Sequence, residues 1–264
     1  MECWHMSGAG NDFMVIDARG KTLDFSHLAK TLCAQTGADG FMAVDHSETA
    51  DFRLHFYNSD GSRGEMCGNG SRCVCKFAYD HGIAGKDMTV QTDAGIIRGW
   101  HLDDQLYRVQ LNLPSVADLH RKGDIAYVEL GNPGVPHAVA EVPGLSHDDR
   151  EKLRDHAKAL RFDPAFPKGA NVNFYTWLED KSIRILTYER GVEDYTLACG
   201  TGSASTAAVL YLQGKLPGGF VTVENPGGNL AVTIGGDGRS IHKVLLEGSA
   251  IKLQSIHISE GDEL

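Results

Sequence analysis

Two short glycine-rich stretches, Cys67-Gly68-Asn69-Gly70-Ser71 and Cys199-Gly200-Thr201-Gly202-Ser203, decide how this chain is organised. They lie 132 residues apart, which is half of the 264-residue length. Further matches at the same offset are Tyr79 with Tyr211, Gly82 with Gly214, and Gly95 with Gly227. Two unrelated glycine-rich turns are the alternative, but similarity at a fixed spacing is typical of an internal duplication. We therefore predict two halves of similar structure.

Each stretch opens a segment of helical character. The first helix is expected from Asn69 to His81 and the second from Gly202 to Gln213, each followed by a glycine suited to a helix end. The second segment is almost wholly apolar. Because a helix that is apolar on all sides is buried, we expect it to occupy the centre of its half.

Runs of β-prone residues surround both helices and predict strands. These runs are Phe13–Asp17, Phe52–Tyr57, Met88–Thr92, Leu106–Leu111, Ile125–Leu130, Val172–Thr176, Ser182–Tyr188, Val221–Glu224 and His242–Gly248. Two further helices are expected, from Ser146 to Leu160 with Ser146 as N-cap and from Ser26 to Gln35. The predicted class is α+β, with two pseudo-symmetric halves. Each half is expected to be a strongly curved, mostly antiparallel sheet or barrel wrapped around a central apolar helix.

The join between the halves is expected near Leu113-Pro114-Ser115. Residues 1–114 then form the half that carries Cys67, with the C-terminal tail 252–264 as a candidate addition to it. Residues 115–251 form the half that carries Cys199. We expect the active site in the cleft between them.

Composition limits the classes of function. With 25 basic and 35 acidic residues the formal charge is −10, so no basic excess indicates a nucleic-acid partner. No apolar run approaches the length of a membrane span, and no secretory signal is visible at the N-terminus. A cytoplasmic location is the expectation, and there the six cysteines are expected as thiols rather than disulfides.

A cysteine at a helix N-terminus has unusual chemistry. The positive end of the helix dipole favours thiolate and lowers the pKa of the thiol. The N–H groups of Gly68, Asn69 and Gly70, and those of Gly200, Thr201 and Gly202, are expected to bind an anion. If the halves face each other, the carboxylate of an α-amino acid fits between the helix ends. One thiolate would then remove the α-proton while the other thiol protonates the opposite side, which inverts the α-carbon.

Other interpretations of the cysteines are less well supported. A single cysteine in a glycine-rich turn is more often inert than catalytic, but two copies at matched spacing favour a functional pair. Cys73 and Cys75 stand two apart on a helix and point in different directions, and no zinc-ribbon or His-Glu-x-x-His pattern occurs. We therefore expect Cys3, Cys33, Cys73 and Cys75 to be packing residues, with neither a metal nor a cofactor.

Beyond the cysteines, six segments spread in order over nearly the whole chain resemble the diaminopimelate epimerase family. They are Gly8-Ala9-Gly10-Asn11-Asp12-Phe13, Asn58-Ser59-Asp60-Gly61-Ser62 with Met66-Cys67-Gly68-Asn69-Gly70-Ser71-Arg72-Cys73, Gly131-Asn132-Pro133 with His137-Ala138-Val139, Gly169-Ala170-Asn171-Val172-Asn173-Phe174, Tyr188-Glu189-Arg190-Gly191-Val192, and Ala198-Cys199-Gly200-Thr201-Gly202. The resemblance implies cofactor-independent epimerisation of LL-diaminopimelate to meso-diaminopimelate, for lysine and peptidoglycan precursors. It also implies a site in the cleft between the halves, closure of that cleft over substrate, and a homodimer.

The resemblance also implies residue roles. Cys67 and Cys199 would be the base and acid, and Asn11 would help to hold the reacting amino end. The residues that would hold the reacting carboxylate through backbone N–H groups are Gly68, Asn69, Gly200 and Thr201. Those that would bind the distal carboxylate are Asn58, Asn132, Asn171 and Arg190, with Glu189 binding the distal ammonium. Asparagines also commonly form turns, and Glu189 with Arg190 also suits a surface ion pair. His137 is either an orienting residue or a satisfied polar one.

Three features depart from the family pattern and bear on substrate preference. Ser7 stands where the family usually has His, Tyr195 replaces a usual Glu, and three residues separate Pro133 from His137. Two alternatives therefore accompany the main hypothesis. One is a racemase of another amino acid, for instance a basic one. The other is an amino acid binding module without chemistry, against which the paired cysteines argue.

Overall fold

The computed structural model describes residues 1–64, 67–179 and 181–258. It divides into two compact units: unit 1 is Met1–Val109 together with the C-terminal segment from Glu247, and unit 2 is Gln110–Leu246. Both boundaries lie five residues before those expected from the sequence. Residues just beyond Val109 already belong to unit 2, where the Leu111 N–H donates to the Val244 carbonyl at 2.9 Å.

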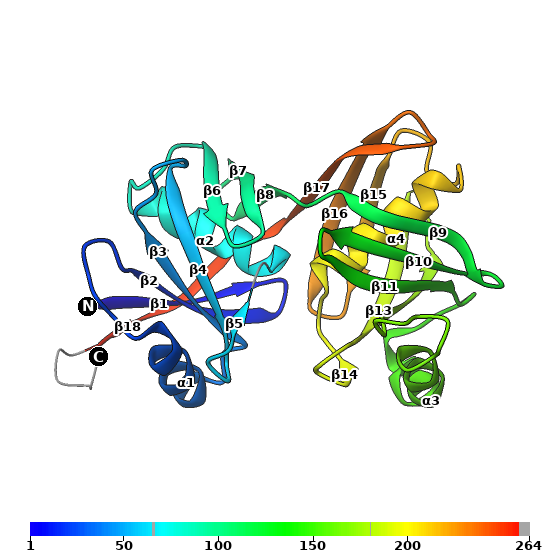
Figure 1. Ribbon diagram of the computed structural model, residues 1–264, viewed down its shortest axis with the longest axis horizontal. Coiled ribbons are helices and arrows are strands. Elements are labelled where there is room, and N and C mark those ends of the chain that lie inside the picture. The colour runs from blue at the N-terminus through cyan, green and yellow to red at the C-terminus, as the bar shows by residue number, and fades with distance from the viewer. Residues whose placement is uncertain (65–66, 180, 259–264) are drawn as a thin grey trace. The chain divides into compact units, whose positions relative to one another are not determined.

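Unit 1 contains two helices and most of the strands that surround them (Figure 1). Its elements are β1 (Glu2–Gly8), β2 (Asn11–Asp17), α1 (Phe25–Thr36), β3 (Gly40–Asp45), β4 (Phe52–Asn58), β5 (Arg63–Gly64), α2 (Gly68–Asp80), β6 (Asp87–Thr92), β7 (Gly95–Asp103), β8 (Leu106–Gln110) and β18 (Ile251–His257). Strand β17 (Ile241–Ser249) begins in unit 2 and ends in unit 1.

Most strand pairs among the described residues of unit 1 are antiparallel, and two are parallel. The pairs β18–β1, β1–β2, β3–β4, β6–β7 and β7–β8 are antiparallel, whereas β2–β3 and β4–β6 are parallel. A parallel pair needs a long crossover, usually a helix. Helix α1 supplies the crossover between β2 and β3, and α2 supplies the one between β4 and β6.

Unit 2 repeats this plan. Its elements are β9 (Pro114–Lys122), β10 (Ile125–Gly131), β11 (Gly134–Glu141), the short 3-10 helix η1 (His147–Asp149), α3 (Arg150–Arg161), β12 (Asn171–Trp177), β13 (Ser182–Glu189), β14 (Asp194–Tyr195), α4 (Gly200–Leu212), β15 (Phe220–Asn225) and β16 (Gly228–Gly236). The parallel pairs are β11–β12, joined through α3, and β13–β15, joined through α4. Each unit is therefore a mostly antiparallel curved sheet, as the sequence predicts. The two helical crossovers in each unit are a feature that the sequence did not reveal.

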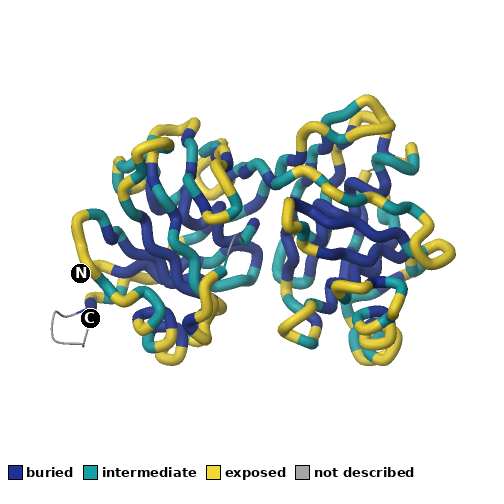
Figure 2. The backbone as a smooth tube through the Cα atoms, viewed as in Figure 1, coloured by how far each residue is buried: buried dark blue, intermediate teal, exposed yellow. Residues whose placement is uncertain are grey.

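Helices α2 and α4 are the buried centres of the two units. Each has 13 residues, and Gly68–Asp80 and Gly200–Leu212 are separated by the same 132 positions as the motifs. Ten residues of each helix are buried, and Figure 2 shows both helices dark within their units. Gly82 at φ 65° and Gly214 at φ 71° follow the helix ends in the left-handed conformation that glycine adopts without strain.

The two other helices differ slightly from prediction. Ser146 does cap a helical turn, accepting from the Asp148 N–H and forming a capping box with Asp149. That turn is the 3-10 helix η1, so the α-helix begins only at Arg150. Helix α1 extends from Phe25 to Thr36 and takes its N-cap from Asp24. Among the described residues no helix is long and apolar enough to cross a membrane.

Burial of α4 gives a direct test of the central-helix architecture. Leu210 is fully buried in α4, so its replacement by Ala should leave a cavity and cost roughly 2–5 kcal/mol. Leu253 in β18 is 50% exposed, so the Leu253→Ala control should change the free energy of unfolding by less than about 0.5 kcal/mol. Urea denaturation followed by circular dichroism measures both. Equal, small shifts would contradict the burial of α4.

Candidate active site

Cys67 is the N-cap of α2. Its backbone is extended (φ −132°, ψ 120°), and its Sγ accepts a hydrogen bond from the Gly70 N–H at 3.5 Å. The thiol is half-buried, whereas Gly68 and Gly70 are buried. The sulfur thus takes the place that a Ser or Asp oxygen usually has at a helix start.

The turn between β1 and β2 brings Asn11 to this helix end. The turn passes through Gly10 at φ 89°, and the approach is close: a Cβ on Gly8 would lie 2.8 Å from the Asn69 carbonyl oxygen. Asn69 Nδ2 donates to Asn11 Oδ1 at 2.6 Å, and Asn11 Nδ2 donates to Asp39 Oδ2 at 3.2 Å. The structure therefore brings Asn11, Asn69 and Cys67 together in unit 1.

Cys199 is the corresponding N-cap of α4. Its Sγ accepts from the Gly202 N–H at 3.3 Å and lies 3.5 Å from Thr201 Oγ1. Burial raises the pKa of the Cys199 thiol well above its ordinary value, and the Glu189 carboxylate raises it further, against smaller opposing effects of Thr201 and Gly202. The sequence-based expectation of a lowered pKa is therefore wrong at Cys199. Desolvation is the larger cause of the raised pKa there, and the neighbouring negative charge is the second.

The expected anion sites also need a correction. The N–H groups of Gly70 and Gly202 donate to the sulfur atoms of Cys67 and Cys199, so they do not point at a ligand. The remaining backbone groups proposed for carboxylate binding are those of Gly68, Asn69, Gly200 and Thr201, in the first turns of α2 and α4. The first N–H groups of a helix have no intrahelical hydrogen-bond partner, and a capping side chain necessarily uses one of them.

His137 lies in a buried polar network that sequence patterns did not reveal. Asn173 Nδ2 lies 3.2 Å from His137 Nδ1, and Thr187 Oγ1 donates to Asn173 Oδ1 at 3.0 Å. Because an amide nitrogen donates, Nδ1 accepts, and the neutral ring carries its proton on Nε2. Burial lowers the pKa of His137 to about 3, with the Arg190 charge acting in the same direction, so the ring stays neutral at physiological pH.

The residues proposed for distal recognition are only partly assembled within unit 2. Asn171 Oδ1 accepts from the Arg190 N–H at 2.8 Å, and Arg190 Nη1 donates to the Lys168 carbonyl at 2.9 Å. Glu189 Oε1 accepts from Thr196 Oγ1 at 2.8 Å, and its carboxylate also accepts a hydrogen bond from the Cys199 thiol. Glu189 therefore lies beside the Cys199 thiol.

Two other predicted residues stand apart from these contacts. Asn58 ends β4 in unit 1, where its Nδ2 donates to Ser62 Oγ at 2.9 Å. Asn132 is exposed in the turn between β10 and β11 of unit 2. Within the part of the chain that the structure describes, neither hydrogen-bonds to another predicted site residue.

Comparison with known proteins identifies the family of this chain. A model of the diaminopimelate epimerase family matches residues 3–112 and 130–253. The diaminopimelate epimerase of Aquifex aeolicus (strain VF5) is 38% identical over 280 aligned residues, covering 98% of this chain and 98% of that protein. The diaminopimelate epimerase of Hydrogenobaculum sp. (strain Y04AAS1) is 39% identical, covering 93% and 94%. The chain belongs to the diaminopimelate epimerase family.

A solved structure of low sequence identity supports the fold of this family member. The Bacillus anthracis phenazine biosynthesis protein of the PhzF family superposes with a TM-score of 0.75 at 14% identity, covering 98% of this chain and 99% of that one. At that identity the likeness shows the fold alone.

The departures from the family pattern have structural positions. Ser7 Oγ donates to the Asn11 carbonyl at 3.5 Å, so it lies beside the β1–β2 turn. Tyr195 is buried in β14, where its ring packs edge-on against Tyr188 at 5.4 Å between centroids. Tyr195 therefore contributes to the core of unit 2, and Ser7 lies on the segment that positions Asn11.

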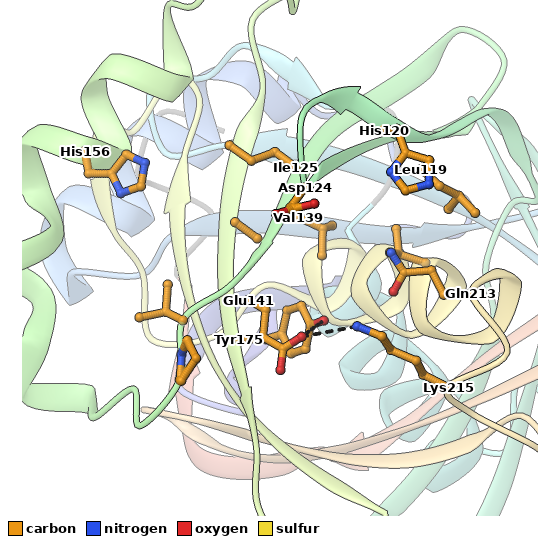
Figure 3. Close-up of a pocket in the computed structure, with 14 residues that line it drawn as sticks. Leu119, His120, Asp124, Ile125, Val139, Glu141, His156, Tyr175, Gln213 and Lys215 are labelled. Carbon is orange, nitrogen blue, oxygen red and sulfur yellow. Dashed lines mark hydrogen bonds and ion pairs between the residues drawn. The ribbon is translucent and has the colours of Figure 1, made fainter.

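A separate pocket of about 740 Å³ lies in unit 2 of this family member (Figure 3). Its lining includes Val209, Gln213 and Lys215, which places it at the opposite end of α4 from Cys199. Tyr175 Oη donates to Glu141 Oε2 at 3.0 Å and Lys215 Nζ lies 3.2 Å from the same oxygen. Glu141 and Lys215 of this pocket thus form an ion pair with each other, away from the motif residues.

The two motif glycines Gly70 and Gly202 give a matched pair of substitutions. A Cβ at Gly202 would meet Asn173 Oδ1 at 2.3 Å and Thr187 Oγ1 at 3.1 Å, both held in the His137 network. A Cβ at Gly70 would meet the flexible end of Met42. We expect Gly202→Ala to destabilise the protein by about 1–3 kcal/mol through overpacking.

Gly70→Ala is the control and should cost clearly less, because a Met side chain can move aside. Thermal unfolding of the two variants checks this. A larger loss for Gly70→Ala would contradict the rigidity of the Asn173 network.

Proposed function

We propose that this protein interconverts LL- and meso-diaminopimelate without a cofactor, by proton transfer between the α-carbon and the thiols of Cys67 and Cys199. Membership of the diaminopimelate epimerase family supports an epimerase reaction. The observation that carries the two-thiol mechanism is the repeated geometry: each unit places one thiol at the start of its central helix, bonded to the third helical N–H.

The helix starts supply what the reaction needs beyond a base. An α-C–H is a very weak acid, so the negative charge that develops on deprotonation must be stabilised. In this proposal the carboxylate next to the reacting carbon binds the N–H groups of Gly68, Asn69, Gly200 and Thr201, at the positive ends of α2 and α4. Asn11, already fixed by Asn69, holds the reacting amino group through its remaining oxygen lone pair.

The distal end of the substrate is assigned to a second group of residues. Arg190 is exposed and presents a guanidinium, which matches a carboxylate in a bidentate way. Asn171 fixes the Arg190 backbone, and Asn58 and Asn132 complete the proposed carboxylate site. Glu189 binds the distal ammonium. That ammonium would also offset the effect of the Glu189 charge on Cys199.

The proposal includes a closed cleft between the two units, a homodimer and a cytoplasmic location. Closure would exclude water and strengthen the electrostatic interactions at the reacting carbon. A role in lysine and peptidoglycan precursor synthesis follows from the proposed substrate.

Isotope exchange tests the reaction itself. In D₂O, the protein should incorporate deuterium at the α-carbon of LL-diaminopimelate while meso-diaminopimelate forms, because the proton delivered comes from a thiol equilibrated with solvent. Proton NMR and chiral chromatography measure the two processes. Lysine, histidine and glutamate serve as comparison substrates.

The outcome separates the alternatives. Exchange with a basic amino acid but none with diaminopimelate would assign the protein to another racemase of this fold. Binding of an amino acid without exchange at any α-carbon would make it a binding module and overturn the proposal.

Removal of either thiol tests the proposed pair. Cys67→Ala and Cys199→Ala should each abolish epimerisation, since each removes the group that acts on one side of the α-carbon. Cys33→Ala is the control: Cys33 is buried in α1 and outside both helix starts, so turnover should be retained. Full activity in either motif variant would contradict the two-thiol mechanism.

A further inference from the structure

Arg72 is a buried arginine of α2. Its side chain extends back to the first residues of the helix. Its Nη1 donates to the Gly68 carbonyl at 3.2 Å, its Nη2 to Asn69 Oδ1 at 3.1 Å and its Nε to the Ser249 carbonyl at 3.4 Å. The side chain has no solvent exposure. All three acceptors are neutral oxygens, and among the described residues no carboxylate forms an ion pair with Arg72.

An isolated buried cation is costly, and a guanidinium does not give up its proton to relieve that cost. Burial lowers the pKa of Arg72, and a negative charge on Cys73, Cys67 or Cys75 would act in the opposite direction. Among the described residues, these three cysteines are therefore the groups whose ionised form would balance the charge of Arg72.

Two of the three thiols are unsuited to that role. Cys73 and Cys75 are fully buried, and burial raises the pKa of each to about 12, so both stay protonated at neutral pH. Cys67 is half-buried and directly precedes Gly68, whose carbonyl the guanidinium binds. Cys67 also receives the Gly70 N–H at the positive end of α2.

The duplication makes the second unit an internal control. The position that corresponds to Arg72, 132 residues later, is Ala204. The equivalent of Arg72 is therefore missing from unit 2, where the Cys199 thiol lies beside the Glu189 carboxylate. The two motifs share their helix-cap geometry, but a buried arginine accompanies the first and a carboxylate accompanies the second.

We propose that Arg72 is the built-in counter-ion of Cys67, which holds this thiol as thiolate in the resting protein, whereas Cys199 rests as a thiol. Arg72 is a positioning residue in this scheme: it acts through Cys67 and through Asn69, which it orients. The catalytic consequence rests on the proposed epimerase function. Cys67 is then the base in the resting enzyme and Cys199 is the acid.

The inversion step takes up one proton and releases one proton. The Cys67 thiolate takes the α-proton and becomes a thiol, while the Cys199 thiol gives its proton to the opposite side of the carbon and becomes a thiolate. No electron is transferred to or from another molecule. After turnover Arg72 faces a neutral thiol, so exchange of protons with solvent restores the resting form.

Alkylation of the unmodified protein tests the charge states directly. The rate of iodoacetamide labelling of Cys67 and of Cys199 is followed against pH, with each peptide quantified by mass spectrometry. Because only the thiolate reacts, the midpoint reports ionisation. The midpoint of Cys67 should lie below the ordinary value of about 8.5, and that of Cys199 above it. The reverse order would overturn the proposal without any variant of Arg72.

Variants identify Arg72 as the cause. Arg72→Met should raise the Cys67 midpoint by about one pH unit or more, and Arg72→Lys, which keeps a charge, should restore much of the shift. Neither should move the midpoint of Cys199. The control is Arg98→Met, which removes an exposed arginine of the same unit paired with Asp87. An unchanged Cys67 midpoint in folded Arg72→Met would refute the role of Arg72.

This experiment needs no turnover and is therefore independent of the epimerase assignment. Shifted midpoints without any deuterium exchange would leave Arg72 as the counter-ion of Cys67 and overturn only the proposed reaction. Deuterium exchange at the α-carbon together with an unshifted Cys67 midpoint would support the proposed reaction and overturn only the role of Arg72.

Discussion

A hydrogen bond from a helical N–H to a cysteine sulfur is the constraint on which both halves of this protein depend. Gly70 donates to Cys67 and Gly202 donates to Cys199, each at the first turn of a helix buried at the centre of its unit. A buried helix start cannot leave its N–H groups without partners. A thiol cap satisfies one of them and at the same time fixes the sulfur atom at the start of a buried helix.

The duplication repeats this cap but not its electrostatic surroundings. In unit 2 a buried thiol faces the Glu189 carboxylate, and burial and that charge together keep it protonated. In unit 1 the half-buried thiol belongs to the residue before Gly68, whose carbonyl accepts a hydrogen bond from the buried Arg72. A separation of one pKa unit corresponds to about 1.4 kcal/mol between protonation states. Modest differences in neighbouring charge are therefore enough to give two equivalent helix starts distinct protonation.

The duplication and the central helices can be predicted from the sequence because both depend on local residue patterns. Gly68–Asp80 and Gly200–Leu212 follow from repeated glycines, apolar runs and terminal glycines, and the structure keeps the same spacing. The direction of the Cys199 pKa was not predictable in this way. The helix dipole can be inferred from the position of the residue, but Glu189 reaches the thiol only through the path of β13. Burial is likewise a property of the assembled unit.

Contacts between distant segments account for the site features that the sequence did not reveal. Asn173 and Thr187 come from adjacent strands, β12 and β13, which place them opposite each other in the antiparallel register. That pairing fixes the amide of Asn173 and hence the Nε2–H form of His137, whose buried Nε2 has no protein partner within the described residues. The residues around Asn173 predicted a strand, but only the register between β12 and β13 shows which side chains contact each other.

The charge asymmetry has a consequence for any reaction in which one thiol is base and the other acid. If both thiols had the same pKa, the form with one thiolate and one thiol would be most populated only near that pH, and half of it would have the wrong member ionised. When the two pKa values are separated, one productive form is dominant throughout the interval between them. Opposite charges beside equivalent sulfur atoms therefore widen the pH range of the active form, an advantage that a perfectly symmetric pair of half-sites would lack.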